Sequence, residues 1–145
     1  MEKNLTIHEQ LRRNTVALIS LAVAVTSLGY NTWRNEASEH NRNQRLVSIE
    51  LLLMLGDLQQ LTLDRQYGKD IDAEAILREA WAKVLTIRDI SMVAEGSVPV
   101  SAMNLFDVWS ADYDQLGSGT KAKDRIMVAL DQVRQDSQDI LKSLD

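Results

Sequence analysis

The chain has 145 residues, of which 45% are hydrophobic and 26% are charged, and its formal net charge is −5. It contains no cysteine, which excludes disulfide bonds and thiolate metal sites. The acidic balance leaves no electrostatic footprint for nucleic acid, so we expect no nucleic-acid partner.

The first predicted element is an uncharged run from Thr15 to Trp33. As a helix it would rise about 28 Å at ~1.5 Å per residue, close to the ~30 Å hydrocarbon layer of a bilayer. Basic and aromatic residues, which are typical of membrane interfaces, flank the run: Arg12, Arg13, Tyr30, Trp33 and Arg34. We therefore predict an N-terminal tail over residues 1–14, a transmembrane helix over 15–33 and one domain over 34–145, with membrane lipid as a partner.

Two other interpretations of the apolar run are open. A basic start, an apolar middle and a possible cleavage site at Ser27-Leu28-Gly29 are compatible with a signal peptide, whose removal would release an exported soluble helical protein. That site lacks the A-x-A pattern. A buried helix of a soluble protein is disfavoured because no side of the run is polar enough to meet water. We therefore favour a membrane anchor.

Basic residues near the ends of the run predict its orientation. The counts nearly tie, with Lys3, Arg12 and Arg13 before the run and Arg34, Arg42 and Arg45 after it. The Arg12-Arg13 doublet adjoins the run and the amino terminus adds a positive charge. We therefore expect a cytoplasmic N-terminus and an exported C-terminal domain.

Small and polar side chains form one stripe along the predicted span, at alternating spacings of three and four residues. Such residues let helix backbones approach closely in lipid. The stripe predicts a helix–helix contact in the membrane through Ala17, Ser20, Ala24 and Ser27, with Asn31 continuing it.

The helix of the span can continue into the domain, because no proline precedes Pro99 and Gly56 is the sole glycine between Trp33 and Tyr67. An apolar seam of coiled-coil type follows, which would serve either as a partner-docking surface or as part of the core: Val47, Leu51, Met54, Leu58 and Leu61. Further apolar residues widen it almost around the helix, as in the central helix of a bundle: Leu46, Ile49, Leu52, Leu53, Leu55 and Leu63.

Turn residues divide the rest of the chain into three more helices. Asp70 or Asp72 is predicted to cap a helix from Ala73 to about Ala94, and Gly96 suits the left-handed residue that closes it. Val98-Pro99-Val100 is predicted to be an extended connector. Ser101 would then cap a helix to Leu116, and Thr120 would cap the last helix.

The inner faces of these three helices are predicted from their apolar spacing. They comprise Ile76, Ala80, Val84, Ile87 and Ile90; Met103, Phe106, Trp109, Tyr113 and Leu116; and Ile126, Leu130, Val133, Ser137, Ile140 and Leu144. Because strand signals are absent, the predicted fold is all-α, with one N-terminal transmembrane helix followed by a small bundle of about four helices.

No group of residues forms a recognised chemical site. His8 and His40 would lie on opposite sides of the membrane, whereas a metal site needs three or four ligands. The acidic residues 70–74 lack the calcium-loop pattern, and residues 117–121 lack the phosphate-loop spacing. The acids at 107, 112 and 114, beside Trp109 and Tyr113, could form an aromatic-walled binding surface. We expect no catalytic, cofactor-binding or metal-binding residue and no enzyme activity.

Tyr30-Asn31-Thr32-Trp33-Arg34-Asn35-Glu36, at the end of the predicted span, resembles a segment of small single-pass membrane proteins of Gram-negative bacteria. The resemblance covers Val16 to about Leu61 and implies an uncleaved anchor in a bacterial inner membrane. It implies no activity, cofactor or functional residue.

These features predict a single-pass, non-catalytic interaction or accessory protein at the membrane surface. Its partner would be another protein or a second copy of the chain. A sensory ligand-binding module is the alternative from another class, because a helix that leaves the membrane into a four-helix bundle resembles the ligand-binding part of bacterial chemoreceptors. Such a module would signal through a partner.

Overall fold

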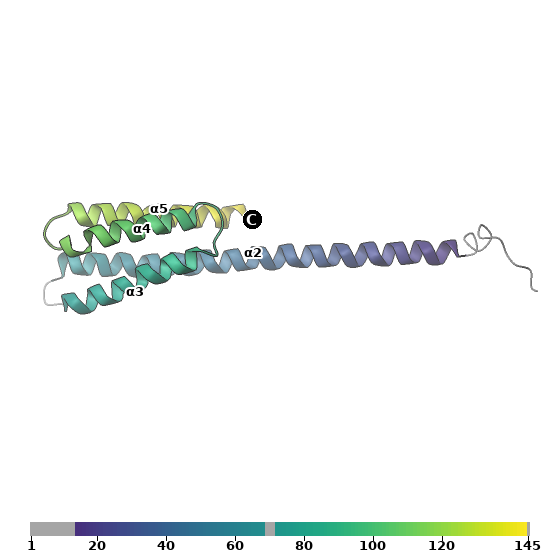
Figure 1. The fold of residues 1–145 in the computed structure, drawn as a ribbon, viewed down its shortest axis with the longest axis horizontal. Helices are drawn as coiled ribbons and strands as arrows, with labels where there is room; N and C mark the ends of the chain where they lie inside the picture. Colours follow the sequence, from purple (N-terminus) through teal and green to yellow (C-terminus); the bar gives the residue numbers. More distant parts are fainter. Residues whose placement is uncertain (1–13, 69–71, 145) are drawn as a thin grey trace, which may run out of the picture. The chain divides into compact units, whose positions relative to one another are not determined.

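The computed structural model describes residues 14–68 and 72–144, and this part of the chain contains helices and no strand. Its elements are α2 (Thr15–Tyr67), α3 (Ala73–Ser91), α4 (Val98–Asp112), the 3-10 helix η1 (Tyr113–Gln115) and α5 (Lys121–Ser143) (Figure 1). The predicted all-α class is confirmed for these residues. The helix predicted to continue from the apolar run into the domain is also confirmed, because α2 is a single helix of 53 residues.

The chain divides into two compact units, Met1–His40 and Asn41–Asp145, and α2 contributes residues to both. In the first unit the described residues, 14–40, belong almost entirely to α2 and are all exposed. The second unit is a four-helix bundle built from the last part of α2 with α3, α4 and α5.

Contacts between helices set their order within the bundle. α4 packs along both α5 and α3. Lys83 Nζ of α3 lies 2.6 Å from Asp57 Oδ2 of α2, and Arg134 of α5 donates to the side-chain oxygen of Gln59 on α2. In the bundle α2 therefore contacts both α3 and α5.

The core joins one apolar face from each helix. Leu51, Leu55 and Leu58 of α2 have no exposed surface. Most of the faces predicted for α3 and α5 are confirmed as buried, namely Ile76, Ala80, Val84 and Ile87, and Ile126, Leu130, Val133, Ser137 and Ile140. Ile90 and Leu144, also predicted, are partly buried against this core. Each large apolar side chain buried in this way stabilises the fold by about 1.5–3 kcal/mol.

Aromatic rings fill the core between α3 and α4. The ring centroids of Trp81 and Tyr113 lie 5.2 Å apart, and those of Trp81 and Trp109 lie 6.3 Å apart, both in edge-to-face geometry. Phe106 closes the cluster, with its ring centroid 6.2 Å from that of Trp81 and 4.9 Å from the guanidinium carbon of Arg88. These arrangements stabilise the packing beyond the burial of area alone.

One of the predicted helix-end signals is confirmed. Asp72 Oδ1 accepts hydrogen bonds from the N–H groups of Glu74 (3.1 Å) and Ala75 (3.0 Å), which caps α3. Asp70, the other candidate cap, lies outside the described residues. Gly96 has the predicted left-handed conformation, with a φ of +63°, but it does not close α3, whose C-cap is Met92. Thr120 occupies the N-cap position of α5, but its side chain makes no capping hydrogen bond.

The extended connector predicted at Val98-Pro99-Val100 is wrong, because these residues form the first turn of α4. The first N–H groups of a helix have no intrahelical acceptor, so proline is well tolerated there. Ser101 consequently lies inside α4 and is not its cap, and its hydroxyl donates to the Ser97 and Val98 carbonyls at 3.3 and 3.2 Å.

The face that α4 turns to the core also differs in part from the prediction. Met103, predicted to point inward, is 43% exposed. Trp109 and Leu116 are buried as predicted, and Phe106 and Tyr113 are partly buried against the core. Val98, Ala102 and Leu105, which were not predicted, complete the buried apolar face. α3 also ends earlier than predicted, at Ser91, whose hydroxyl donates to the carbonyl of Arg88 at 2.6 Å.

The prediction that the leucine-rich helix is central to the bundle is also wrong. Leu46, Ile49 and Leu53 are 59%, 45% and 68% exposed. Since α2 is flanked by α3 and α5, its remaining side faces solvent. The bundle therefore leaves part of this apolar helix uncovered.

Candidate membrane segment and interaction surfaces

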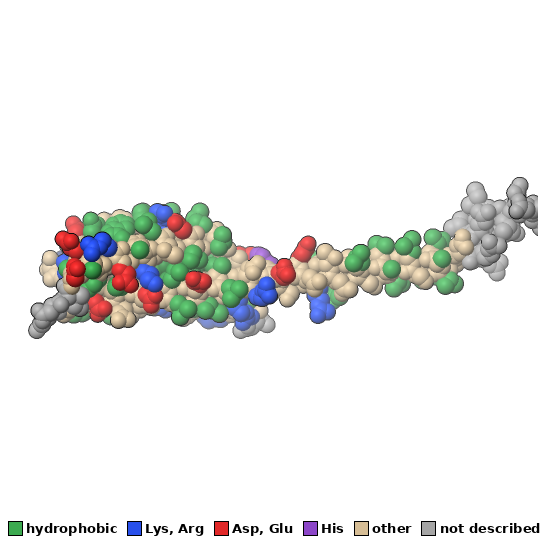
Figure 2. Space-filling model, turned by 90° about the horizontal axis from the view of Figure 1, so that it is seen from below, with side chains coloured by type: hydrophobic (Ala, Val, Ile, Leu, Met, Phe, Trp, Pro, Cys, Tyr) green, Lys and Arg blue, Asp and Glu red, His purple; other side chains and the backbone are tan. Residues whose placement is uncertain are grey.

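Residues 15–33 of α2 carry large apolar side chains on all of the helix surface except the stripe of small and polar residues. These large side chains are between 48% and 77% exposed: Val16, Leu18, Ile19, Leu21, Val23, Val25 and Leu28. On the face shown in Figure 2, hydrophobic side chains run along this stretch of α2 and charged ones lie beyond it. Among the described residues, α2 is the one helix long and apolar enough to cross a membrane by length and composition. A helix with so wide an apolar surface is typically covered by an apolar surrounding.

The polar side chains of this segment include two whose hydroxyls bond to their own helix. Thr26 Oγ1 donates to the carbonyl of Ala22 at 2.8 Å, and Thr32 Oγ1 donates to that of Leu28 at 3.0 Å. Such bonds to the preceding turn satisfy a hydroxyl without water. Both groups are therefore compatible with a hydrocarbon environment, where an unsatisfied polar group is costly.

The predicted contact stripe lies entirely on exposed helix surface. In the first unit α2 is the only described element, so no second helix covers the stripe, which consists of Ala17, Ser20, Ala24 and Ser27. Whether these residues meet another helix in lipid stays a prediction.

The aromatic residues predicted as interface anchors lie next to each other on α2. The ring centroids of Tyr30 and Trp33 are 6.1 Å apart, and their side chains are 58% and 65% exposed. Arg34 follows directly and is exposed as well. Amphipathic rings beside a basic residue suit the headgroup region of a bilayer. Arg12 and Arg13, predicted for the opposite interface, lie outside the described residues, as does His8.

Comparisons with known proteins supply no identity for the chain. No protein-family model, curated protein or solved structure matches it. The resemblance of residues 30–36 to small bacterial membrane proteins therefore stays a hypothesis. We infer function from the surfaces that the structure exposes.

The leucine seam of α2 lies in and beside the core. Leu51 and Leu58 are fully buried, whereas Val47, Met54 and Leu61 are partly buried and pack against the core cluster. Leu51 and Leu58 are therefore core residues, whereas the three partly buried residues keep some exposed surface. The apolar surface of α2 that is accessible lies on the opposite side, at Leu46, Ile49 and Leu53.

The predicted aromatic-walled surface is not formed. Trp109 is fully buried, so it belongs to the core and cannot wall an external site. Asp112 is 3% exposed and accepts a hydrogen bond from Arg125 of α5. Asp107 and Asp114 remain exposed on the surface. The Asp112–Arg125 pair was missed in the sequence because the partners are 13 residues apart, on different helices.

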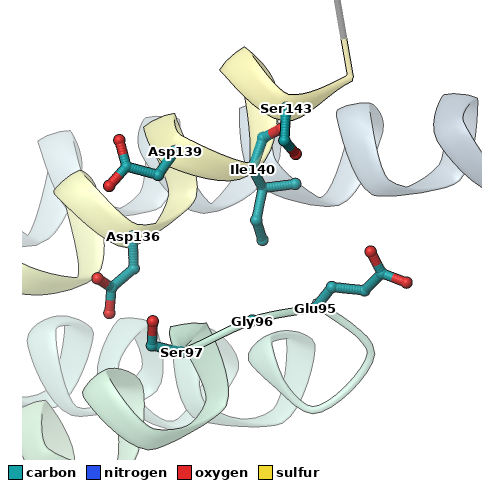
Figure 3. Close-up of a pocket in the computed structure, with 7 residues that line it drawn as sticks. All are labelled: Glu95, Gly96, Ser97, Asp136, Asp139, Ile140 and Ser143. Atoms are coloured by element: carbon teal, nitrogen blue, oxygen red, sulfur yellow. The ribbon is translucent and has the colours of Figure 1, made fainter.

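A cavity of about 270 Å³ lies in the second unit, where the loop between α3 and α4 faces the end of α5 (Figure 3). It is lined by Glu95, Gly96, Ser97, Asp136, Asp139, Ile140 and Ser143. The Asp139 carboxylate lies 2.8 Å from Lys142 Nζ. Over residues 14–68 and 72–144, no group of three or more His, Cys, Asp or Glu is arranged to hold a metal ion. The cavity therefore presents negative charge without the geometry of a cation site.

The glycine-rich segment between η1 and α5 is an interhelical turn. Gly117 has a φ of +90°, and its N–H donates to Gln66 Oε1 of α2 at 3.1 Å. A Cβ atom at this position would lie 2.8 Å from Arg65 Nη1. The glycine is thus explained by backbone conformation and by close packing against α2.

Proposed function

We propose that this chain is a single-pass, membrane-anchored, non-catalytic interaction protein whose helical bundle binds a protein partner at the membrane surface. The observation that supports this proposal best is the exposed apolar surface of residues 15–33. The bundle adds an apolar outer face on α2 as a place where a partner can bind.

Energetics favour lipid as the surrounding of this segment. Burial of one large apolar side chain is worth about 1.5–3 kcal/mol. For the exposed Val, Leu and Ile side chains of residues 15–33, the total is on the order of 10 kcal/mol, which is comparable with the whole stability of a typical domain. Water is therefore an unfavourable permanent environment for the segment.

The proposal includes a location and an orientation. The flanking basic residues favour a cytoplasmic N-terminus and an exported bundle, and the resemblance of residues 30–36 favours a bacterial inner membrane. A reporter enzyme that is active only outside the cytoplasm, fused after Asp145, should be active. An inactive reporter on a membrane-inserted chain would reverse the orientation.

Membrane fractionation tests the anchor directly. We expect the full-length chain to pellet with membranes, to resist alkaline carbonate and to dissolve only in detergent. The intact mass should match the 16.4 kDa of this sequence. A mass that lacks residues 1–29 would support the exported soluble protein instead, and an intact chain in the supernatant would refute the anchor.

A charged residue introduced into the span, compared with the same change on the bundle, tests whether the span holds the chain in the membrane. Leu21→Arg places a cation within the predicted span, where insertion costs about 2.5–3.5 kcal/mol near its centre, so the pelleted fraction should fall. Val128→Arg places the same charge on α5, where Val128 is 71% exposed. This control should leave membrane association unchanged.

A further inference from the structure

The outer face of α2 in the bundle carries an exposed stripe at helical spacing. Leu46, Ile49 and Leu53 are followed at the same spacing by Gly56, which is exposed as well. Because Leu51, Leu55 and Leu58 bury the opposite side of the helix, the stripe points away from the core. Its alternating steps of three and four residues match the a and d positions of a coiled coil.

Gly56 has no packing reason within its own chain. Glycine in a helix interior is unfavourable relative to alanine, yet a Cβ atom at position 56 would meet nothing within 4 Å. Its φ is not in the left-handed region either, since Gly96 and Gly117 are the described glycines with positive φ. A glycine on an exposed helix face permits the close approach of another backbone.

Charges beside the stripe indicate which helix would fit. With Leu46 at an a position, Arg45 is a g residue and Glu50 is an e residue. In a parallel, in-register pair each g residue faces the e residue five positions later on the partner helix. Arg45 of each copy would therefore face Glu50 of the other copy, which gives two symmetric pairs of opposite charge. An antiparallel pair would instead set Glu50 against its own copy.

We propose that the outer face of α2, from Arg45 to Gly56, binds the same face of a second copy of this chain in a parallel pair. This inference deepens the proposed function and rests on it for the parallel sense, since chains inserted in one direction carry their bundles on one side of the bilayer. Arg42 and Gln60, at the next heptad positions, bound the apolar contact. Arg45 also donates to the Leu144 carbonyl at 3.4 Å, and a guanidinium carries five N–H donors.

Single cysteines test the contact, because the natural chain has none. In native membranes Leu53→Cys should form a disulfide-linked dimer under mild oxidation, since Leu53 would meet its own copy across the symmetry axis. Val128→Cys on α5, similarly exposed at 71%, should stay monomeric. A monomeric Leu53→Cys chain that melts at the wild-type temperature would overturn the proposal, as would its crosslinking only to other proteins.

Charge reversal tests the partner and the register. In the Leu53→Cys background, Glu50→Arg or Arg45→Glu should lower the dimer yield roughly fivefold, because attraction becomes repulsion at two symmetric places. The double variant Arg45→Glu/Glu50→Arg restores opposite charges and should restore the yield. The parallel pair would be refuted if the double variant did not recover the dimer yield although circular dichroism showed that its folding was unchanged.

The experiments distinguish failure of the membrane anchor from failure of the parallel pair. A chain that resists carbonate extraction but gives no Leu53→Cys dimer retains the anchor and loses the pair. A chain that crosslinks through Leu53→Cys yet extracts as an unprocessed soluble protein retains the pair and loses the anchor.

Discussion

The side-chain amide of Gln44 donates a hydrogen bond of 3.1 Å to the carbonyl of Val93, 49 residues away. The carbonyl oxygen of the same amide accepts a 3.1 Å bond from the N–H of Glu95. Gln44 is only 7% exposed. One side chain of α2 therefore satisfies two backbone groups of the loop that joins α3 to α4 and fixes where that loop lies.

Replacement of Gln44 by alanine should lower the free energy of unfolding by about 1–3 kcal/mol, because backbone groups in a part-buried loop lose their partners. Gln44→Glu should also destabilise the bundle, since a carboxylate cannot donate to Val93. Gln60→Ala, at an exposed position of the same helix, should change little. Thermal unfolding followed by circular dichroism in detergent measures all three, and equal effects of Gln44→Ala and Gln60→Ala would contradict the role of Gln44.

The Asp112–Arg125 pair should matter more than the ion pairs on the surface. The Asp112 side chain is 4% exposed whereas that of Arg125 is 60% exposed. Arg125→Ala leaves a buried carboxylate without its cation and should cost about 1–3 kcal/mol. Lys142→Ala removes an exposed pair with Asp139 and should cost at most about 1 kcal/mol. A double-mutant cycle between positions 112 and 125 should give a coupling energy above that of the surface pair.

Gly117→Ala should destabilise the turn before α5 by about 1–2 kcal/mol, because a φ of +90° is unfavourable for residues with a Cβ. The new methyl group would also press on the Arg65 guanidinium, 2.8 Å from the added Cβ. Gly119→Ala is the matched control, since nothing lies within 4 Å of a Cβ there. Adding Arg65→Ala to Gly117→Ala separates steric pressure from backbone strain, because only the former would be relieved in the melting temperature.

The stability of the bundle should depend on pH through Lys123 and Asp124, whose charged groups lie 2.7 Å apart. The hydrogen bond from Lys123 holds the pKa of Asp124 below its ordinary value of 3.8. Bonds to Asp124 and then Tyr67 raise the pKa of Lys123 above 10.5. The stabilisation from this ion pair is therefore fully present between pH 3.8 and pH 10.5, the ordinary pKa values of the two groups.

The acid side of this dependence is the easier to measure. As the pH falls below 3.8 and through the lowered pKa of Asp124, its contribution to stability should disappear. Lys123→Gln should bring that pKa back toward its ordinary value. NMR titration of the Asp124 carboxyl in both proteins tests this, and identical titration curves would contradict the proposed cause.

Features governed by local chain chemistry were predictable from the sequence. The Asp72 cap and the left-handed Gly96 depend on residues within one or two turns, so their sequence signals were sufficient. The error at Pro99 has a physical origin as well. Proline disfavours a helix before it but is favoured in the first helical turn, and the sequence alone does not say which effect applies. The wrong choice moved the predicted start of α4 from Val98 to Ser101.

Features governed by tertiary contacts were not predictable. Apolar spacing marked α2 as hydrophobic on nearly every side, but the side left open depends on where α3 and α5 pack. Leu53 and Leu55 are both leucines, yet one is 68% exposed and the other fully buried. Gln44 lies among polar neighbours with nothing to distinguish it, because its partners lie about 50 positions along the chain.

The distribution of tryptophan gives the molecule its own optical reporters. Trp33 lies in the first unit and is 65% exposed, whereas Trp109 is fully buried and Trp81 contacts it edge-on in the bundle. Indole emission shifts to shorter wavelengths as the ring leaves water. Transfer into vesicles should thus be visible through Trp33, and melting of the aromatic cluster through the other two. A Trp33→Phe chain would isolate the second signal and let the bundle be followed by fluorescence in any detergent.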